Sequence, residues 1–161
     1  MHGHSPSAMK RFLLSVTAMT LLLAGFSAAQ GLASDRTKKK LSRQELGQGS
    51  AIGSGDPALA LKVDILDGAV ASAVPADAAS ANVFALRSEG EKQQTMLNLR
   101  TDLGVALKFD LYISRDGDTF EYASTCAVTP GISGFEMWQY PVREFALGNP
   151  RVLPKGKMAC E

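Results

Sequence analysis

Histidine is nearly absent from the chain, since its only two residues of this type, His2 and His4, stand at the extreme N-terminus. Imidazole is the side chain that most often moves protons near neutral pH, and it completes Ser-His and Cys-His nucleophilic pairs. If the first residues are removed during maturation, these mechanisms and histidine-bearing metal centres are excluded. The rest of the sequence indicates no catalytic residue, no metal ligand and no cofactor.

The sequence also lacks a phosphate-binding loop and a surplus of basic charge. The glycine-rich stretch from Gly47 to Gly55 has no predicted strand before it and no Lys-Ser or Lys-Thr after it, as a nucleotide-binding loop requires. The 17 basic residues nearly balance the 16 acidic ones, so the overall charge does not favour nucleic acid. We therefore expect neither a nucleotide nor a nucleic acid as a partner.

An apolar run near the N-terminus is too short for a permanent membrane span. It covers residues 12–26, follows a Lys-Arg pair at 10–11, and ends at the small residues Ser-Ala-Ala at 27–29. A spanning helix needs about 20 apolar residues. A basic end, a short apolar segment and small residues before the cleavage point are instead typical of an export signal. We predict a signal peptide over residues 1–29, no permanent membrane anchor, and a periplasmic or secreted mature protein.

Residues 30–57 have the composition of a flexible basic, glycine-rich arm. Lys38, Lys39 and Lys40 form a basic cluster, and residues 47–56 have the composition of a flexible linker. Such a segment buries too little apolar surface to offset the entropy lost on ordering. We expect a solvated arm. Docking on anionic lipid or on an acidic partner, and proteolytic trimming, stay open as alternatives.

From residue 58 onward the sequence predicts a single all-β domain, 58–161. Residues 59–66 and 105–114 alternate apolar and polar side chains with a period of two, as strands with one buried face do. Asp-Gly pairs at 67–68 and 116–117 are typical of tight turns. Further strands are predicted at 83–88, 95–101, 119–128, 135–140, 142–147 and 151–153.

The number and length of these strands favour an antiparallel β-sandwich, with a small barrel as the alternative. Short strands separated by frequent proline and glycine, without a long segment of helical period, are typical of both architectures. Residues 69–81 contain seven alanines and Pro75, so a short helix and a loop are both open there.

The two cysteines, Cys126 and Cys160, both belong to the part predicted to be exported. An oxidising compartment and an even number of cysteines favour a disulfide. A metal or redox pair is disfavoured, because the spacing matches no compact motif and no histidine is available to complete a zinc site. The predicted bridge would fasten the C-terminal segment to the domain.

The segment 130–141 is the richest in recognition chemistry, because it holds the single Trp of the chain among other aromatic side chains. In a strand, Trp138 shares a face with Tyr140, while Phe135 points to the opposite side. An exposed Trp138–Tyr140 pair would offer a stacking platform for a sugar ring or an anchor for a partner protein. In the alternative, Trp138 fills the core. The predicted ligand-binding residues are Phe135, Glu136, Trp138, Tyr140 and Arg143.

Carboxylates offer the remaining chemistry. Asp110 and Glu121 are expected on the outward faces of neighbouring strands, where two close acids could hydrolyse a glycoside. Asp116 and Asp118 could supply oxygen ligands to Ca²⁺. Solvated strand faces and a plain turn are the favoured interpretations of these four residues.

The sequence thus predicts a non-catalytic binding or accessory protein of the cell envelope that recognises a partner protein or a glycan. Two alternatives stay open. One is an assembly subunit whose N-terminal arm adds a strand to the sheet edge of another molecule. The other is a carboxylate-dependent glycosidase or a Ca²⁺-dependent lectin.

Overall fold

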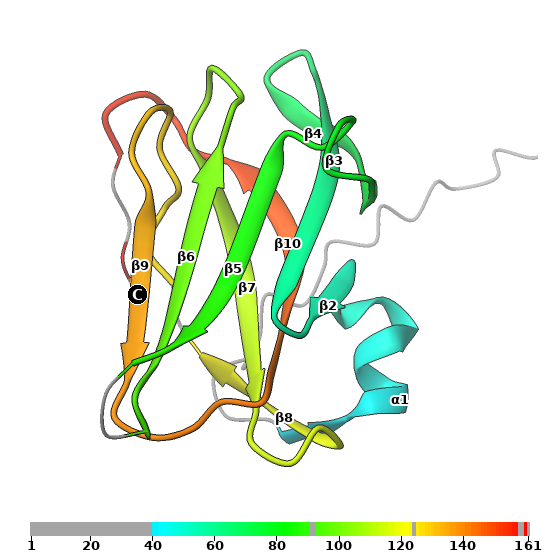
Figure 1. The fold of residues 1–161 in the computed structure, drawn as a ribbon. Coiled ribbons are helices and arrows are strands. Elements are labelled where there is room, and N and C mark those ends of the chain that lie inside the picture. The colour runs from blue at the N-terminus through cyan, green and yellow to red at the C-terminus, as the bar shows by residue number, and fades with distance from the viewer. Residues whose placement is uncertain (1–39, 91–92, 124, 158–159, 161) are drawn as a thin grey trace, which may run out of the picture. The chain divides into compact units, whose positions relative to one another are not determined.

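The computed structural model describes residues 40–90, 93–123, 125–157 and 160. The predicted signal peptide, residues 1–29, and the predicted arm as far as residue 39 lie outside this part of the chain. The described residues form two antiparallel five-stranded sheets packed face to face (Figure 1), which confirms the predicted β-sandwich. Each sheet keeps two edge strands, so the barrel alternative is wrong.

Sheet B faces the viewer in Figure 1. Its strands are, in spatial order, β4 (Ala69–Pro75), β3 (Ala58–Leu66), β5 (Val83–Glu89), β6 (Thr95–Thr101) and β9 (Gly134–Trp138). The sequence allows a short helix or a loop over residues 69–81. The structure instead forms the strand β4 in the first part of this segment. Asp67 and Gly68 both have positive φ values, 51° and 76°, which suit a two-residue hairpin turn that leads the chain back along β3.

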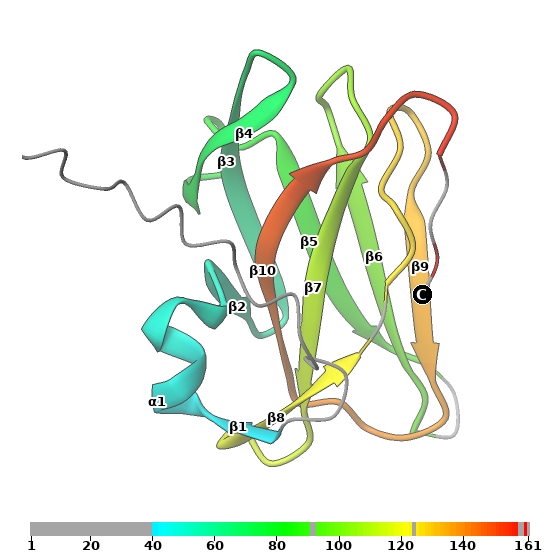
Figure 2. The same ribbon diagram turned by 180° about the vertical axis from the view of Figure 1, so that it is seen from behind.

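Sheet A faces the viewer in Figure 2. Its strands are, in spatial order, β1 (Lys40–Ser42), β8 (Thr119–Ala123), β7 (Leu107–Ser114), β10 (Glu144–Val152) and β2 (Gly53–Gly55). A short helix, α1 (Arg43–Glu45), and an irregular helical turn, η2 (Leu46–Ser50), connect β1 to β2. This connection leads from one edge of the sheet to the other, because β1 and β2 are its two outermost strands.

The inner faces of the two sheets meet in the main core. The period-two pattern correctly predicts the buried side of the two clearest strands, with Leu61 and Val63 on β3 and Leu107, Phe109 and Leu111 on β7. The other fully buried large side chains of this core come from β5, β6, β10 and the β8–β9 connection. They include Val83, Leu97, Leu99, Val128, Phe145 and Leu147.

A second apolar cluster covers part of the outer face of sheet A. It comprises Leu41, Leu46, Tyr112, Phe120 and Ala146. Phe120 belongs to this cluster because it pairs with Ser114 across the β7–β8 hairpin, with residues 115–119 between them. A shift of one residue in this register would move every β8 side chain to the opposite face.

The structure differs from the predicted arm over residues 40–57, which belong to the domain from Lys40 onward. Leu41 and Leu46 are buried, and they are the two apolar side chains that this segment contributes to the second cluster. Ser42 and Glu45 form a reciprocal capping box at α1, in which Ser42 N donates to Glu45 Oε2 at 2.8 Å. Two buried leucines, one cap and the pairing of β1 with β8 and of β2 with β10 therefore attach a segment whose composition resembles a linker.

Two glycines in this region, Gly55 and Gly148, permit close packing of the backbone. A Cβ atom on Gly55 would lie 2.6 Å from Phe145 Cζ. A Cβ atom on Gly148 of β10 would lie 1.9 Å from the carbonyl oxygen of Ser50. No side chain fits at either contact, so the segment around β2 can approach β10 only where glycine is present.

The C-terminal strand β10 is continuous where two strands, 142–147 and 151–153, are predicted. Its pairing with β7 shifts between Gly148 and Arg151. Asn149, with a φ of 44°, and Pro150 lie in this irregular stretch, where proline does not remove a ladder hydrogen bond. No helix in the described part of the chain is long and apolar enough to cross a membrane.

Candidate functional site

Strand β9 separates the predicted site residues onto the two faces of sheet B. Trp138 and Tyr140 are half-buried and pack against the main core. Phe135 points to the outer face, where 64% of it is exposed. The Trp138–Tyr140 pair therefore does not stand on the outer face as a free aromatic platform.

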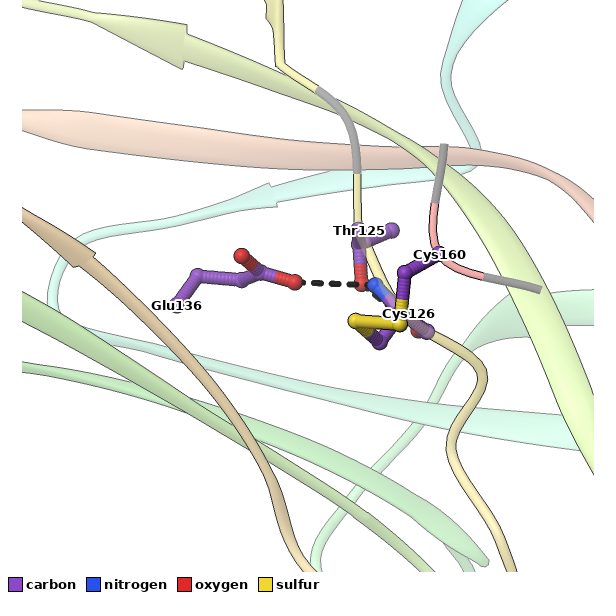
Figure 3. Close-up of a disulfide and its surroundings, with 4 residues drawn as sticks. All are labelled: Thr125, Cys126, Glu136 and Cys160. Carbon is purple, nitrogen blue, oxygen red and sulfur yellow. Dashed lines mark hydrogen bonds between the residues drawn. A yellow bond between two sulfur atoms is a disulfide. The ribbon is translucent and has the colours of Figure 1, made fainter. Parts of the chain in front are cut away.

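The other predicted site residues have structural partners. Glu136 Oε1 accepts a hydrogen bond of 2.9 Å from the backbone N–H of Cys126, beside the predicted disulfide between Cys126 and Cys160, which the structure contains (Figure 3). The guanidinium of Arg115 lies 3.7 Å from the centre of the Tyr140 ring. Arg143 Nη1 donates to the carbonyl oxygen of Asp116 at 2.9 Å. Their role in ligand binding stays a prediction.

The outer face of sheet B carries an exposed and largely apolar surface instead. Outward residues on neighbouring strands stand opposite one another in three rows, which are Ala60–Phe84–Arg100, Ala58–Leu86–Asn98–Phe135 and Ser88–Met96–Met137. Four large apolar side chains in these rows are substantially exposed, namely Leu86 (53%), Met96 (38%), Phe135 (64%) and Met137 (58%). Exposed apolar side chains that adjoin one another in this way are typical of binding surfaces.

A groove of about 610 Å³ lies within this surface, and we call it the sheet B groove. Its apolar lining includes Ala58, Ala60, Phe84, Leu86, Met96 and Phe135. Ala58 and Ala60 on β3 have short side chains and stand opposite the larger Leu86 and Phe84 on β5. This difference in side-chain length produces a hollow in the sheet face. Its other lining residues include Ala78 and Ser133, which follow β4 and precede β9, respectively.

Leu86 and Met96 are candidate contact residues that the sequence-based prediction missed. The signal was present in β5, where Val83, Phe84, Ala85 and Leu86 are apolar on both faces of the strand. In a sandwich whose two sheets pack face to face, only one face of each strand enters the core, so an uninterrupted apolar run indicates a second covered or ligand-binding face.

The expected approach of Asp110 and Glu121 across the hairpin is wrong. Glu121 lies opposite Ile113, so the two carboxylates are on different faces of sheet A. Asp110 is buried rather than solvated, and it accepts hydrogen bonds from Arg151 Nη1 at 2.8 Å and from Asn149 Nδ2 at 3.1 Å. Glu121 pairs with Lys40 at 2.8 Å. Among the described residues, no group of three or more His, Cys, Asp or Glu side chains is placed to hold a metal ion.

Asp116 organises the turn between β7 and β8. Its Oδ1 atom accepts hydrogen bonds from the backbone N–H groups of Thr119 and Asp118, both at 2.8 Å, and from the Ser114 hydroxyl at 3.0 Å. These donors favour the ionised carboxylate and lower the pKa of Asp116 from 3.8 to about 2. The aspartate therefore has a structural role, because these three hydrogen bonds hold the turn between β7 and β8.

This lowered pKa predicts a specific loss of stability in acid. Because the folded-state pKa of Asp116 lies below the unfolded value, ionisation of the carboxyl favours the folded state above pH 3.8, and this contribution is lost as the pH falls towards about 2. Asp116→Asn keeps an oxygen that can accept the same hydrogen bonds but removes the titration. We expect the free energy of unfolding, measured by urea denaturation, to decrease less in the variant than in the natural protein over this pH range.

Two other carboxyl groups in this part of sheet A also have lowered pKa values. Arg43 lowers the pKa of Glu144, and Lys40 lowers the pKa of Glu121. The Arg43–Glu144 pair does not involve Asp116 and is the internal control, because its contribution is the same in both proteins. The charge of Asp116 has a smaller effect on the pKa of Glu121, which the pair with Lys40 dominates. Parallel pH dependence in the two proteins would contradict the assigned role of Asp116.

Comparison of the chain with families of known proteins, with curated proteins and with solved structures found no match in any of the three.

Proposed function

We propose that the chain is a non-catalytic binding protein of the cell envelope, and that the sheet B groove is where it holds the apolar part of its ligand. The observation that carries this proposal is the set of exposed, adjoining side chains Leu86, Met96, Phe135 and Met137 on the outer face of a sheet whose inner face already has a complete core. Large apolar side chains in such positions are stabilised when a ligand covers them.

The chemistry of the groove favours an apolar ligand over a sugar ring. Leu86, Met96 and Phe135 offer dispersion contacts, whereas the Trp138–Tyr140 pair that would stack on a sugar is directed towards the core. The proposal keeps Phe135 as a contact residue and moves the centre of the site to β5 and β6.

Export supports an envelope location. A signal peptide over residues 1–29 is predicted by the sequence, and a disulfide between Cys126 and Cys160 is typical of proteins outside the cytoplasm. We propose a periplasmic or secreted location on these two grounds.

Strand addition by the N-terminal arm is a less favoured function. The strands that the described part of the arm contains, β1 and β2, already pair with β8 and β10 of the same chain. Addition to another molecule by these residues would require them to leave their own sheet.

Nile red, a neutral dye whose fluorescence rises in apolar surroundings, tests the groove directly. We expect the natural protein to bind the dye and Leu86→Ser to weaken binding about fivefold, because about half of the Leu86 side chain is available for burial. Fluorescence titration of the dye against the full mature chain measures both affinities.

Two matched controls locate the site. Leu66→Ser removes a leucine that is 65% exposed, slightly more than Leu86, and that does not line the groove, so dye affinity should not change. Trp138→Phe should also leave it unchanged, because Trp138 does not line the groove. Absence of dye binding, or a loss confined to Trp138→Phe, would contradict the proposal.

A further inference from the structure

The charge of the sheet B groove is of one sign. Arg100 is the single charged residue among the residues that line it, and the polar ones, Ser88, Asn98 and Ser133, are neutral. No carboxylate belongs to this lining. An apolar hollow with one guanidinium is complementary to a ligand that combines an apolar body with a negative charge.

Arg100 lies at one end of the outer face of β6. It is four residues from Met96 on the same face of the strand, with Asn98 between them, which places the two positions about 13 Å apart along an extended strand. The apolar neighbours Leu86 and Phe135 stand on either side of Asn98, at the middle of this distance. The groove therefore has an apolar part that leads to a cationic end.

The guanidinium of Arg100 contacts an aromatic ring and forms only a weak ion pair. It lies 4.3 Å from the centre of the ring of Phe84, which also lines the groove. Its nearest carboxylate contact, from Nη1 to Asp102 Oδ1, is 4.0 Å long, and both side chains are more than half exposed. Such a pair is weak, and a guanidinium has five N–H donors, so Arg100 can still bind an anion.

We propose that the sheet B groove binds a single-chain amphipathic carboxylate of the fatty-acid type. Its alkyl chain lies along Leu86, Met96 and Phe135, and its carboxylate accepts hydrogen bonds from Arg100. The inference rests on the proposed function and adds the chemical class of the ligand. A neutral or cationic amphiphile of the same chain length forms the same apolar contacts but lacks the charge-assisted hydrogen bonds.

Displacement of Nile red by three amphiphiles with the same alkyl chain tests the charge preference. The probes are dodecanoate, dodecanol and dodecyltrimethylammonium, each kept below the concentration at which it forms micelles. We expect dodecanoate to bind about tenfold more tightly than the cation, with dodecanol between them. Raising the salt concentration should weaken dodecanoate binding and leave dodecanol binding unchanged, because only the charged head group is screened.

Variants of Arg100 assign the preference to this residue. Arg100→Gln should weaken dodecanoate binding about fivefold and leave dodecanol binding unchanged, whereas Arg100→Lys should retain most of the affinity for dodecanoate. Arg115→Gln, which changes an arginine outside the groove lining, is the matched control and should have no effect. Circular dichroism and thermal unfolding confirm that each variant is folded.

The outcomes separate this inference from the proposed function. If the three amphiphiles bind equally and Arg100→Gln changes nothing, the groove accepts apolar ligands without recognising charge, and the inference is wrong while the proposed function stands. If neither Nile red nor any amphiphile binds, both are wrong. Equal losses of dodecanoate and dodecanol affinity in Arg100→Gln would show that the arginine acts through packing alone, which also overturns the inference.

Discussion

Phe120→Ala is expected to lower the free energy of unfolding by about 3–5 kcal/mol, although Phe120 lies outside the main core. The ring is fully buried on the outer face of sheet A, between β7 and the segment that begins at Lys40. It packs with Leu41 and Leu46, and the guanidinium of Arg43 lies 5.5 Å from its centre. Truncation to alanine leaves a cavity that this short segment cannot fill without separating from the sheet.

Urea denaturation followed by circular dichroism measures the effect of Phe120→Ala. Phe135→Ala is the matched control, because it removes the same side chain from an exposed position and should change stability by less than about 0.5 kcal/mol. Leu46→Ala should cost about 2–3 kcal/mol by itself, and less in the background of Phe120→Ala, because the two side chains share one cluster. A loss below about 1 kcal/mol in Phe120→Ala would show that residues 40–50 do not pack as described.

Removal of the disulfide is expected to cost about 3–4 kcal/mol on the loop-closure model. Cys126 and Cys160 are 34 positions apart, and the loop between them contains β9 and β10. In the unfolded chain the bridge restricts this long loop, so its loss raises the entropy of the unfolded state more than that of the folded state. The variant Cys126→Ser/Cys160→Ser should therefore denature at lower urea concentration with an unchanged fold.

A reductant separates the bridge from the substituted side chains. Dithiothreitol should lower the stability of the natural protein to about that of the double variant and leave the double variant itself unchanged. Two thiols that titrate freely in the natural protein before any reductant is added would contradict the disulfide.

Local sequence patterns predicted where strands occur better than which of their faces are covered. The alternation in 59–66 and 105–114 predicted β3 and β7 and their inner sides, because burial of one face imposes a period of two. It could not show that β7 is buried on both faces, since the second cover comes from Leu41 and Leu46, far away in the sequence. Composition alone does not distinguish a glycine-rich segment that is flexible from one in which glycine permits close packing, so the attachment of this distant segment could not be predicted.

In the candidate site, too, the sequence pattern does not identify the covered face of a strand. On β9, Phe135 and Trp138 necessarily point to opposite faces, but the alternation alone does not identify the inner one. The pairing with β6 decides it, because Trp138 stands opposite the buried Thr95, and Met137 opposite the exposed Met96. The sequence therefore located the segment and one residue that lines the sheet B groove, Phe135, whereas the rest of the groove depends on three other strands.

The order of strands also determines when each layer can be completed as the polypeptide is synthesised. Four of the five strands of sheet B, β3 to β6, are consecutive and lie within residues 58–101. In sheet A, by contrast, the early strands β1 and β2 are matched with β8 and β10, which come from residues 119–123 and 144–152. The strand β1 thus has no partner until β8 has been synthesised, and β2 has none until the last strand, β10, has left the ribosome.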